Sequence, residues 1–312
     1  MAIERHTPKD RRAWLALRGR DVTASAVGAL FGEHEFLSAY ELWAQKTGRM
    51  PRGMDAETPA MQRGRLLEPV AVALMREMHP EWRIEHNAAE NVYYRDPDAR
   101  IGATPDAIVE APGRGLGVVQ IKSVEASVYR RKWIVEGEPE PPLWIALQAS
   151  VEAHLTGAKW AAVAPLVVGH GLEMPIIEVP LAPGVIDAIK SKVADFWQMV
   201  ADGREPEPDY ARDGDVLDAM YAAGDERAEV DLSTDNRIGE LIIERAAARA
   251  TIKAIEADLK AIDAEVKAKM GFAEVAHIGG GRRITWETRR RSGYVAPPTT
   301  YRFLKFPKPE GE

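Results

Sequence analysis

The residues best suited to chemistry lie between Gly102 and Ser123. Asp106 follows a proline, and after a short loop an apolar run of strand character carries Gln120 and Lys122 two positions apart. Side chains two apart on a strand point to the same face, so pairing of the two segments would bring a carboxylate, an amide and an ammonium group together. The backbone carbonyl of Ile121 adds another oxygen. Such a set is suited to holding Mg²⁺ against a phosphate, with Lys122 orienting or deprotonating the attacking water.

Gln120 departs from this pattern, because a carboxylate is the usual ligand at such a position. An amide oxygen can coordinate Mg²⁺ but brings no charge to a site that concentrates negative charge around the metal. We expect weaker metal binding in consequence. Glu110 and Glu125, which flank the two strands, are hypotheses for a compensating carboxylate.

The surrounding pattern predicts an α/β core, because helical and strand periodicities alternate along the chain. Helices are expected over residues 11–47 with a break at Gly32, and over about 60–78, where Leu67, Val70, Leu74 and Met78 form the predicted buried stripe beside Glu68. Strands are expected at 82–84, 91–94, 102–103, 106–109, 117–121, 160–168 and 174–179, and further helices at 143–156 and 185–201. Gly157 is in the usual position for ending the first of these two helices.

Composition shifts after Asp209. Residues 238–270 are rich in Ala, Glu, Lys, Ile and Leu and predict one long helix or a helical hairpin, and 277–294, which contain three consecutive glycines, predict a β-hairpin. Basic residues crowd the stretch from Arg282 to Lys308, and the prolines of the last residues predict a tail. We therefore expect two domains, 1–209 with the chemistry and 210–312 as a helical extension, hairpin and basic tail.

The bulk composition excludes several classes of protein. The chain has 312 residues, a formal net charge of −7 and no cysteine, which excludes disulfides, thiolate zinc sites and iron–sulfur clusters. No apolar run approaches the roughly 20 residues of a membrane helix, and the first residues lack the apolar core of a signal peptide. A cytoplasmic protein with no membrane association is the expectation, and all seven histidines are interpreted as structural or surface residues.

Several motifs in order resemble the YqaJ-type viral recombinases, the lambda exonuclease family of the PD-(D/E)xK nuclease superfamily. The segments that carry the resemblance span about residues 11–205 and are Trp14–Arg18 with Val22–Ser25, Arg63–Glu68, Gly102–Asp106, Gln120–Lys122 and Gln148–Gly157. The resemblance implies a restriction-endonuclease-like core, a central mixed β-sheet flanked by helices.

Carried over by position, the resemblance implies a role for each matching residue. Glu68, Asp106, Gln120 and the Ile121 carbonyl would hold or frame Mg²⁺, with Mn²⁺ as a substitute, and Lys122 would be the catalytic lysine. Gln148 matches a glutamine on the helix that lines the active site, and Arg18 and Ser25 match positions that bind the 5′-phosphate of a DNA end. The implied activity is a phage or prophage 5′-to-3′ exonuclease on double-stranded DNA ends that leaves 3′ overhangs for a single-strand annealing protein, assembled as a homo-oligomer, a ring and possibly a trimer.

Simpler interpretations stay open for each of these residues. Arg18 fits a surface residue, Ser25 a helix cap, Glu68 a solvated helix position, and Gln148 a polar contact between a helix and the sheet. For the whole protein, the alternative is a DNA-end-binding protein of the same fold with weak or lost nuclease activity.

Overall fold

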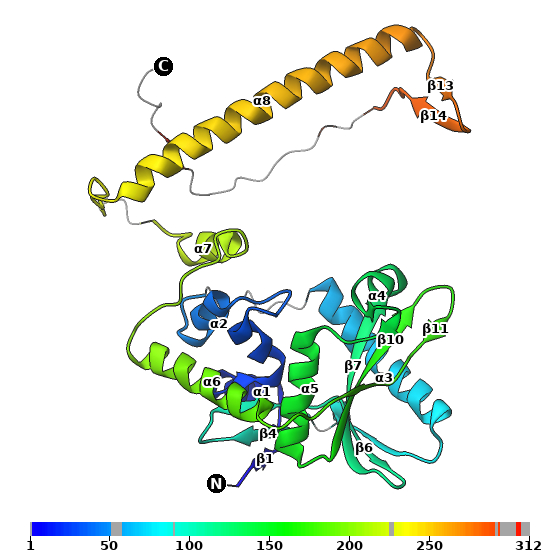
Figure 1. The fold of residues 1–312 in the computed structure, drawn as a ribbon, viewed down its shortest axis with the longest axis vertical. Coiled ribbons are helices and arrows are strands. Elements are labelled where there is room, and N and C mark those ends of the chain that lie inside the picture. The colour runs from blue at the N-terminus through cyan, green and yellow to red at the C-terminus, as the bar shows by residue number, and fades with distance from the viewer. Residues whose placement is uncertain are drawn as a thin grey trace. The chain divides into compact units, whose positions relative to one another are not determined.

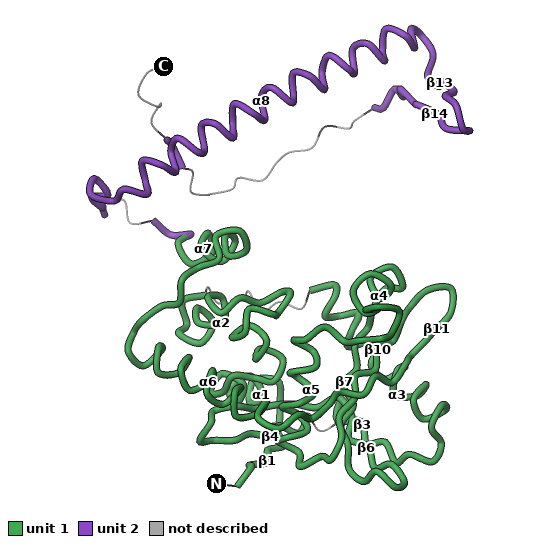
Figure 2. The backbone as a smooth tube through the Cα atoms, in the orientation of Figure 1, with its two compact units in different colours: residues 1–221 green, residues 222–312 purple. Residues whose placement is uncertain are grey.

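A computed structural model describes residues 2–50, 58–89, 91–224, 228–290, 293 and 304–306. The chain divides into two compact units, residues 1–221 and residues 222–312 (Figure 2). The first unit therefore runs beyond the boundary at Asp209 that the sequence predicts, and includes the short helix α7 (Gly214–Met220). None of the helices in the described ranges combines the length and apolar character that a membrane crossing requires.

A six-stranded mixed sheet forms the centre of the first unit (Figure 1). Two long strands, β7 (Gly115–Glu125) and β10 (Trp160–Val168), run parallel, and the other strands pair antiparallel. The remaining members are β3 (Arg83–His86), β6 (Ala107–Ala111), β11 (Leu172–Glu173) and β12 (Ile177–Val179). The predicted pairing of the Asp106 segment with the Gln120 strand is confirmed, since β6 and β7 are neighbours in the sheet.

Helices cover both faces of this sheet, which confirms the predicted α/β architecture. Helix α5 (Leu143–Thr156) packs on one face with α4 (Ala126–Lys132), and α3 (Pro59–Met78) packs on the other. Helix α5 ends at Gly157, as the sequence predicts, with a left-handed φ of 73° that favours glycine.

The buried face of α3 differs from the predicted stripe. Val70 and Met78 are 39% and 46% exposed, whereas Ala71, Val72 and Met75 are buried against the sheet. Apolar residues cover more than half the circumference of this helix, so periodicity does not select the face that the sheet contacts. The helix also continues through Pro69, directly after Glu68.

A second sheet of four strands, β1 (Glu4–His6), β4 (Tyr93–Asp96), β5 (Ile101–Ala103) and β2 (Val22–Thr23), lies beside the first. The prediction of helices throughout residues 11–47 is wrong at its centre. Helix α1 (Arg11–Arg20) ends, β2 pairs in parallel with β5, and residues Ala24–Phe31 form a 3₁₀ helix, η1, before α2 (Ala39–Lys46). The 3₁₀ helix η1 packs closely against α5 because residue 28 is glycine. A Cβ at this position would lie 2.5 Å from the Cβ of Trp144.

Helix α6 (Val185–Ala201) packs with η1, α2 and α5 around a second hydrophobic cluster. The remaining short elements of this unit are η2 (Asn87–Ala89), β8 (Ile134–Val135) and β9 (Glu138–Pro139). The side chains predicted to do chemistry come from α1, η1, α3, β7 and α5, and from the residue before β6.

The second unit contains one long helix, α8 (Asn236–Met270), and a hairpin of β13 (Val275–Ile278) and β14 (Arg282–Thr285), both as predicted. Gly280 and Gly281 turn the hairpin with φ of 77° and 72°. Most of the predicted tail, including Arg291, Arg302 and Lys308, lies outside the described residues.

Candidate active site

Two hollows in the first unit meet at one group of polar side chains. The first has a volume of about 430 Å³ and extends from α1 and η1 to β7 and α5, and the second, of about 490 Å³, lies between α3 and β7. The polar residues that line both are Arg65, Glu68, Asp106, Gln120 and Lys122. Arg18, Ser25 and Gln148 line the first hollow and Ile121 lines the second, so the structure gathers every residue that the sequence predicts for the site.

Asp106 is fixed at the centre of this group by hydrogen bonds from β7. Its Oδ2 accepts a hydrogen bond of 2.8 Å from the backbone N–H of Ile121 and a second one from Nε2 of Gln120. Burial, and next the negative charge of Glu68, raise the pKa of Asp106 to about 7. The carboxylate therefore occupies a place that favours a neutral form or a bound cation.

Lys122 and Gln148 extend the group from β7 to α5. The Nζ of Lys122 donates to Oε1 of Gln148 at 3.0 Å, and Nε2 of Gln148 donates to Oε1 of Gln120 at 2.7 Å. Burial lowers the pKa of Lys122. The hydrogen bonds thus run in one direction, from Lys122 through the two amides to Asp106, and Gln120 directs its nitrogen toward that carboxylate.

Glu68 approaches from α3 and forms a pair with a histidine. Its Oε1 lies 2.7 Å from Nε2 of His86, and both side chains are largely buried. Sequence reasoning, which treated the histidines as structural or surface residues, missed this contact because 18 positions separate the two residues. The contact leaves one Glu68 carboxylate oxygen outside this hydrogen bond.

Arg18 and Ser25 lie at the opposite end of the first hollow. The Arg18 guanidinium is 3.5 Å from Ser25 Oγ, which is also 3.1 Å from Thr23 Oγ1. The Trp14 ring, missed in the sequence as a site residue, lies 4.4 Å from the guanidinium carbon and donates its indole N–H to Thr104 at 3.0 Å. A cation and two hydroxyls therefore face the cavity that Asp106 and Lys122 line.

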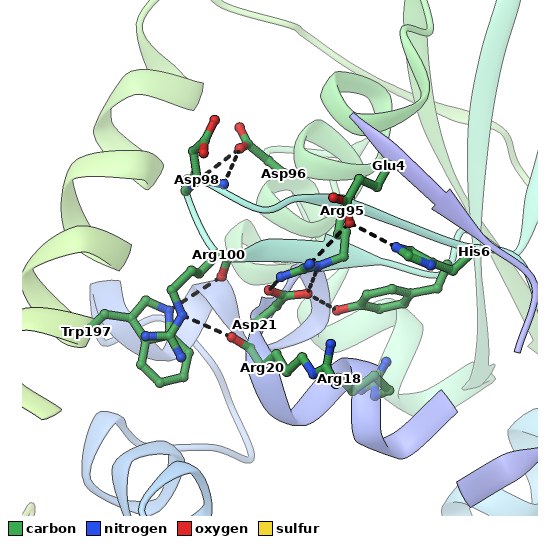
Figure 3. A network of polar contacts seen from close by, with 12 residues as sticks. Glu4, His6, Arg18, Arg20, Asp21, Arg95, Asp96, Asp98, Arg100 and Trp197 are labelled. Carbon is green, nitrogen blue, oxygen red and sulfur yellow. Dashed lines mark hydrogen bonds and ion pairs between the residues drawn. The ribbon is translucent and has the colours of Figure 1, made fainter. Parts of the chain in front are cut away.

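A buried network holds the end of α1 that carries Arg18 (Figure 3). Asp21 is fully buried and accepts hydrogen bonds of 2.9 and 2.8 Å from the guanidinium of Arg95 and one of 3.1 Å from the Tyr93 hydroxyl. Lys46 donates to the backbone carbonyl of Arg18 at 2.7 Å. These contacts fix the junction of α1 and β2 to the four-stranded sheet.

Glu152, one turn beyond Gln148 on α5, is a site residue that sequence reasoning missed. Its side chain is 1% exposed and lines the first hollow; Oε1 accepts from Gln148 Nε2 at 2.9 Å, whereas Oε2 has no hydrogen-bond partner. Burial, and next the charge of Asp106, raise the pKa of Glu152 to about 8. A charged residue four positions from Gln148 on an otherwise apolar helix is the signal that would have found it.

The two carboxylates that the sequence offered as compensation for Gln120 do not approach the site. Glu110 is exposed on β6, 3.6 Å from Arg83, and Glu125 is exposed and accepts from the Ser127 hydroxyl. Neither lines either hollow, so both hypotheses are wrong. Alternation places Glu125 on the opposite face of β7 from Gln120 and Lys122, and Glu110 lies farther along β6, opposite Leu116.

The donors at this site fit a hard divalent cation such as Mg²⁺. No group of three or more Asp, Glu, His or Cys side chains in the described ranges is placed to hold one metal ion. Mg²⁺ in phosphate chemistry, however, commonly uses one or two carboxylates and keeps several waters. Asp106 and Glu68 offer such oxygens, and the buried Glu152 carboxylate has an oxygen without a hydrogen-bond partner among the described residues.

Comparison with known families identifies the segment that carries this site. The model of the YqaJ-like viral recombinase domain matches residues 13–159. This segment is similar to that family. The resemblance that the sequence predicts is thereby confirmed for the segment that holds Arg18, Glu68, Asp106, Lys122 and Glu152.

Several solved structures with similarity to the chain are described as exonucleases. An alkaline exonuclease from Laribacter hongkongensis is 22% identical over 62% of this chain and 93% of its own, with a TM-score of 0.46. Its complex with dAMP gives 23% identity over the same shares and a TM-score of 0.43. A putative exonuclease from Eubacterium rectale is 12% identical over 73% of this chain and 98% of its own, with a TM-score of 0.45. No curated protein matches the chain.

Proposed function

We propose that the protein is a divalent-metal-dependent exonuclease that degrades double-stranded DNA from 5′ ends and leaves 3′ overhangs for recombination by strand annealing. The observation that carries this proposal is the placement, within one YqaJ-like domain, of Asp106, Glu68 and Lys122 at one end of a cavity and Arg18 with Ser25 at the other. The bound metal, Mg²⁺ or Mn²⁺, would neutralise phosphate charge and lower the pKa of a coordinated water.

Each side chain then has a distinct task in the proposed reaction. Arg18 and Ser25 bind the terminal 5′-phosphate through a charge-assisted contact and a hydroxyl donor. Asp106 and Glu68, with the Ile121 carbonyl, hold the metal near the next phosphodiester. Lys122, whose pKa is lowered, orients the attacking water or accepts its proton at Nζ, and Gln148 fixes that Nζ at 3.0 Å.

Linear duplex with a labelled 5′-phosphate tests the proposal. We expect nucleotide release by the parent protein with Mg²⁺ or Mn²⁺, loss of release with EDTA, and losses of about 10²-fold or more in the variants Asp106→Ala and Lys122→Ala. The exposed Glu110→Ala is the matched control and should cleave at the parental rate. Release by Asp106→Ala at the parental rate would contradict the assignment.

A duplex that carries 5′-hydroxyl ends tests the binding end of the cavity. We expect the parent to prefer the 5′-phosphorylated substrate and Arg18→Met to lose that preference while its rate on 5′-hydroxyl ends changes little. Equal rates of the parent on both substrates would remove the assigned role of Arg18 and Ser25.

The second candidate is a DNA-end-binding protein with lost hydrolysis. It is favoured by one observation, namely that Gln120 brings no charge and directs its nitrogen toward Asp106. Tight binding of duplex ends without metal-dependent release in the first assay would support this candidate instead.

The assembly and setting of the nuclease extend the proposal. A nuclease that follows one DNA molecule needs retention beyond its phosphate contacts, because these weaken steeply with salt. We propose a homo-oligomer, a ring and possibly a trimer, working with a single-strand annealing protein in the bacterial cytoplasm as part of a phage or prophage system. Light scattering of the purified protein with and without duplex tests the oligomer, and a monomer under both conditions would refute it.

A further inference from the structure

Gln120 is already engaged as a hydrogen-bonding group and does not supply the missing charge of the site. Its nitrogen donates to Asp106 and to the Ile121 carbonyl, and its oxygen accepts from Gln148 at 2.7 Å. Turning the amide to present oxygen to a cation would set its nitrogen against that of Gln148. The charge that a carboxylate at position 120 would provide must therefore come from another residue.

Glu152 is the carboxylate in the right place to supply it. It lines the same hollow as Asp106 and Gln120, and it is connected to Gln120 through one residue, because Gln148 Nε2 donates to both Gln120 Oε1 and Glu152 Oε1. Glu68, by contrast, is in contact with His86. Helix α5 thus brings a carboxylate to the face of β7 on which Gln120 and Lys122 lie.

The burial of Glu152 calls for a cation at the site. Glu152 is 1% exposed and its Oε2 has no hydrogen-bond partner among the described residues, although a carboxylate with an unpartnered buried oxygen is strongly destabilising. Lys122 attracts the carboxylate and Asp106 repels it, but neither donates a hydrogen bond to Oε2. A divalent cation in the hollow would supply the partner that this buried oxygen lacks.

We propose that Glu152 is a further acidic member of the divalent-cation site beside Asp106, and that it replaces from α5 the carboxylate that β7 lacks at Gln120. This inference rests on the proposed function, since it concerns the cation that the nuclease would use. The charge then comes from a position on α5, and Gln120 and Gln148 form the hydrogen-bonded link between Asp106 and Glu152.

Calorimetric titration of the full chain with Mn²⁺ alone, without DNA, tests the inference. We expect Glu152→Gln, which has the same shape and keeps an acceptor for Gln148, to bind Mn²⁺ about 10- to 100-fold more weakly than the parent. The double variant Q120E/E152Q, which moves the charge to β7, should recover most of that loss. Glu110→Gln removes an exposed carboxylate outside the hollows and is the matched control.

A second readout is the thermal midpoint. Its increase on adding Mn²⁺ should shrink in E152Q, because the variant removes one carboxylate from the cation site. Parental Mn²⁺ affinity in E152Q would overturn the inference. If E152Q does not fold, Glu152→Asp provides the test. Shortening the side chain should weaken Mn²⁺ binding about tenfold, and parental affinity in this variant would again overturn the inference.

The outcomes separate this inference from the proposed function. A parent protein that binds Mn²⁺ and releases nucleotides, beside an E152Q variant with the same affinity, refutes only the role of Glu152. A parent that neither binds Mn²⁺ nor cleaves DNA refutes the nuclease, and the role of Glu152 with it.

Discussion

Replacing Arg95 with methionine tests whether the buried network behind Arg18 stabilises the first unit. Arg95 gives Asp21 two hydrogen bonds of 2.9 and 2.8 Å and is 3.2 Å from Glu4, which is partly exposed. Methionine keeps the apolar stem of the side chain and removes the guanidinium. Among the described residues, the Tyr93 hydroxyl, 3.1 Å away, is then the one side-chain donor left to the fully buried Asp21.

The expected loss of stability comes from the Asp21 carboxylate, which stays buried after Arg95 is removed. Removing one partner of a buried ion pair typically lowers the free energy of unfolding by about 3–5 kcal/mol, because the other charge stays buried without compensation. Total stabilities of about 5–15 kcal/mol make this a large fraction of the whole. The exposed pair of Arg83 and Glu110, 3.6 Å apart, is the comparison, since surface pairs contribute about 0–1 kcal/mol.

Urea unfolding of Arg95→Met and Arg83→Met at pH 7, followed by tryptophan fluorescence, measures the difference. We expect a lower midpoint for the first variant and little change for the second, and the double variant D21N/R95M should recover part of the loss because it removes the uncompensated charge. A destabilisation by Arg95→Met of less than about 1 kcal/mol would refute the reasoning, since it would place the pair with ordinary surface pairs.

Three further predictions concern packing, pH and the phosphate end of the cavity. Gly102→Ala would place its Cβ 1.9 Å from the Tyr93 hydroxyl, so chemical unfolding should show a free energy of unfolding lower by at least about 1–3 kcal/mol. Gly19 has open space around it, so Gly19→Ala should leave the free energy of unfolding unchanged or raise it. Equal effects of the two substitutions would contradict this account. Burial raises the pKa of Asp106 from 3.8 to about 7, so on raising the pH the unfolded state loses this proton before the folded state does. Without metal, the free energy of unfolding should therefore fall between about pH 4 and pH 7. Asp106→Asn should make this fall shallower, and an unchanged slope would count against the pKa shift. Trp14→Leu removes the ring beside Arg18 and should raise KM for 5′-phosphorylated duplex with little change in kcat, and an unaltered KM would exclude a positioning role for the ring.

Much of the architecture could be predicted from local patterns. The bounds of the helix at 143–156, the strand at 160–168 and the helix at 185–201 follow from continuous apolar or amphipathic runs that end at glycine or at breaks in the pattern. The region from Asp21 to Phe31 could not be predicted in this way. Its short strand and 3₁₀ helix are set by pairing with β5 and by close packing against α5, which local propensity does not register.

The sequence by itself determined which residues could do chemistry and on which strand pair they lie. Alternation with a period of two is a property of the backbone, so Gln120 and Lys122 on one face of β7, opposite Asp106, were predictable from their spacing. The order of motifs also determined the YqaJ-like domain. Only the tertiary structure decided which additional groups join them, because the contacts of His86 with Glu68, and of Gln148 with both Gln120 and Glu152, depend on how α3 and α5 dock on the two faces of the sheet. Docking is governed by the fit of whole surfaces. The additional carboxylate that lines the cavity is therefore Glu152 on α5, and not Glu110 or Glu125 on the strands, which the sequence suggested.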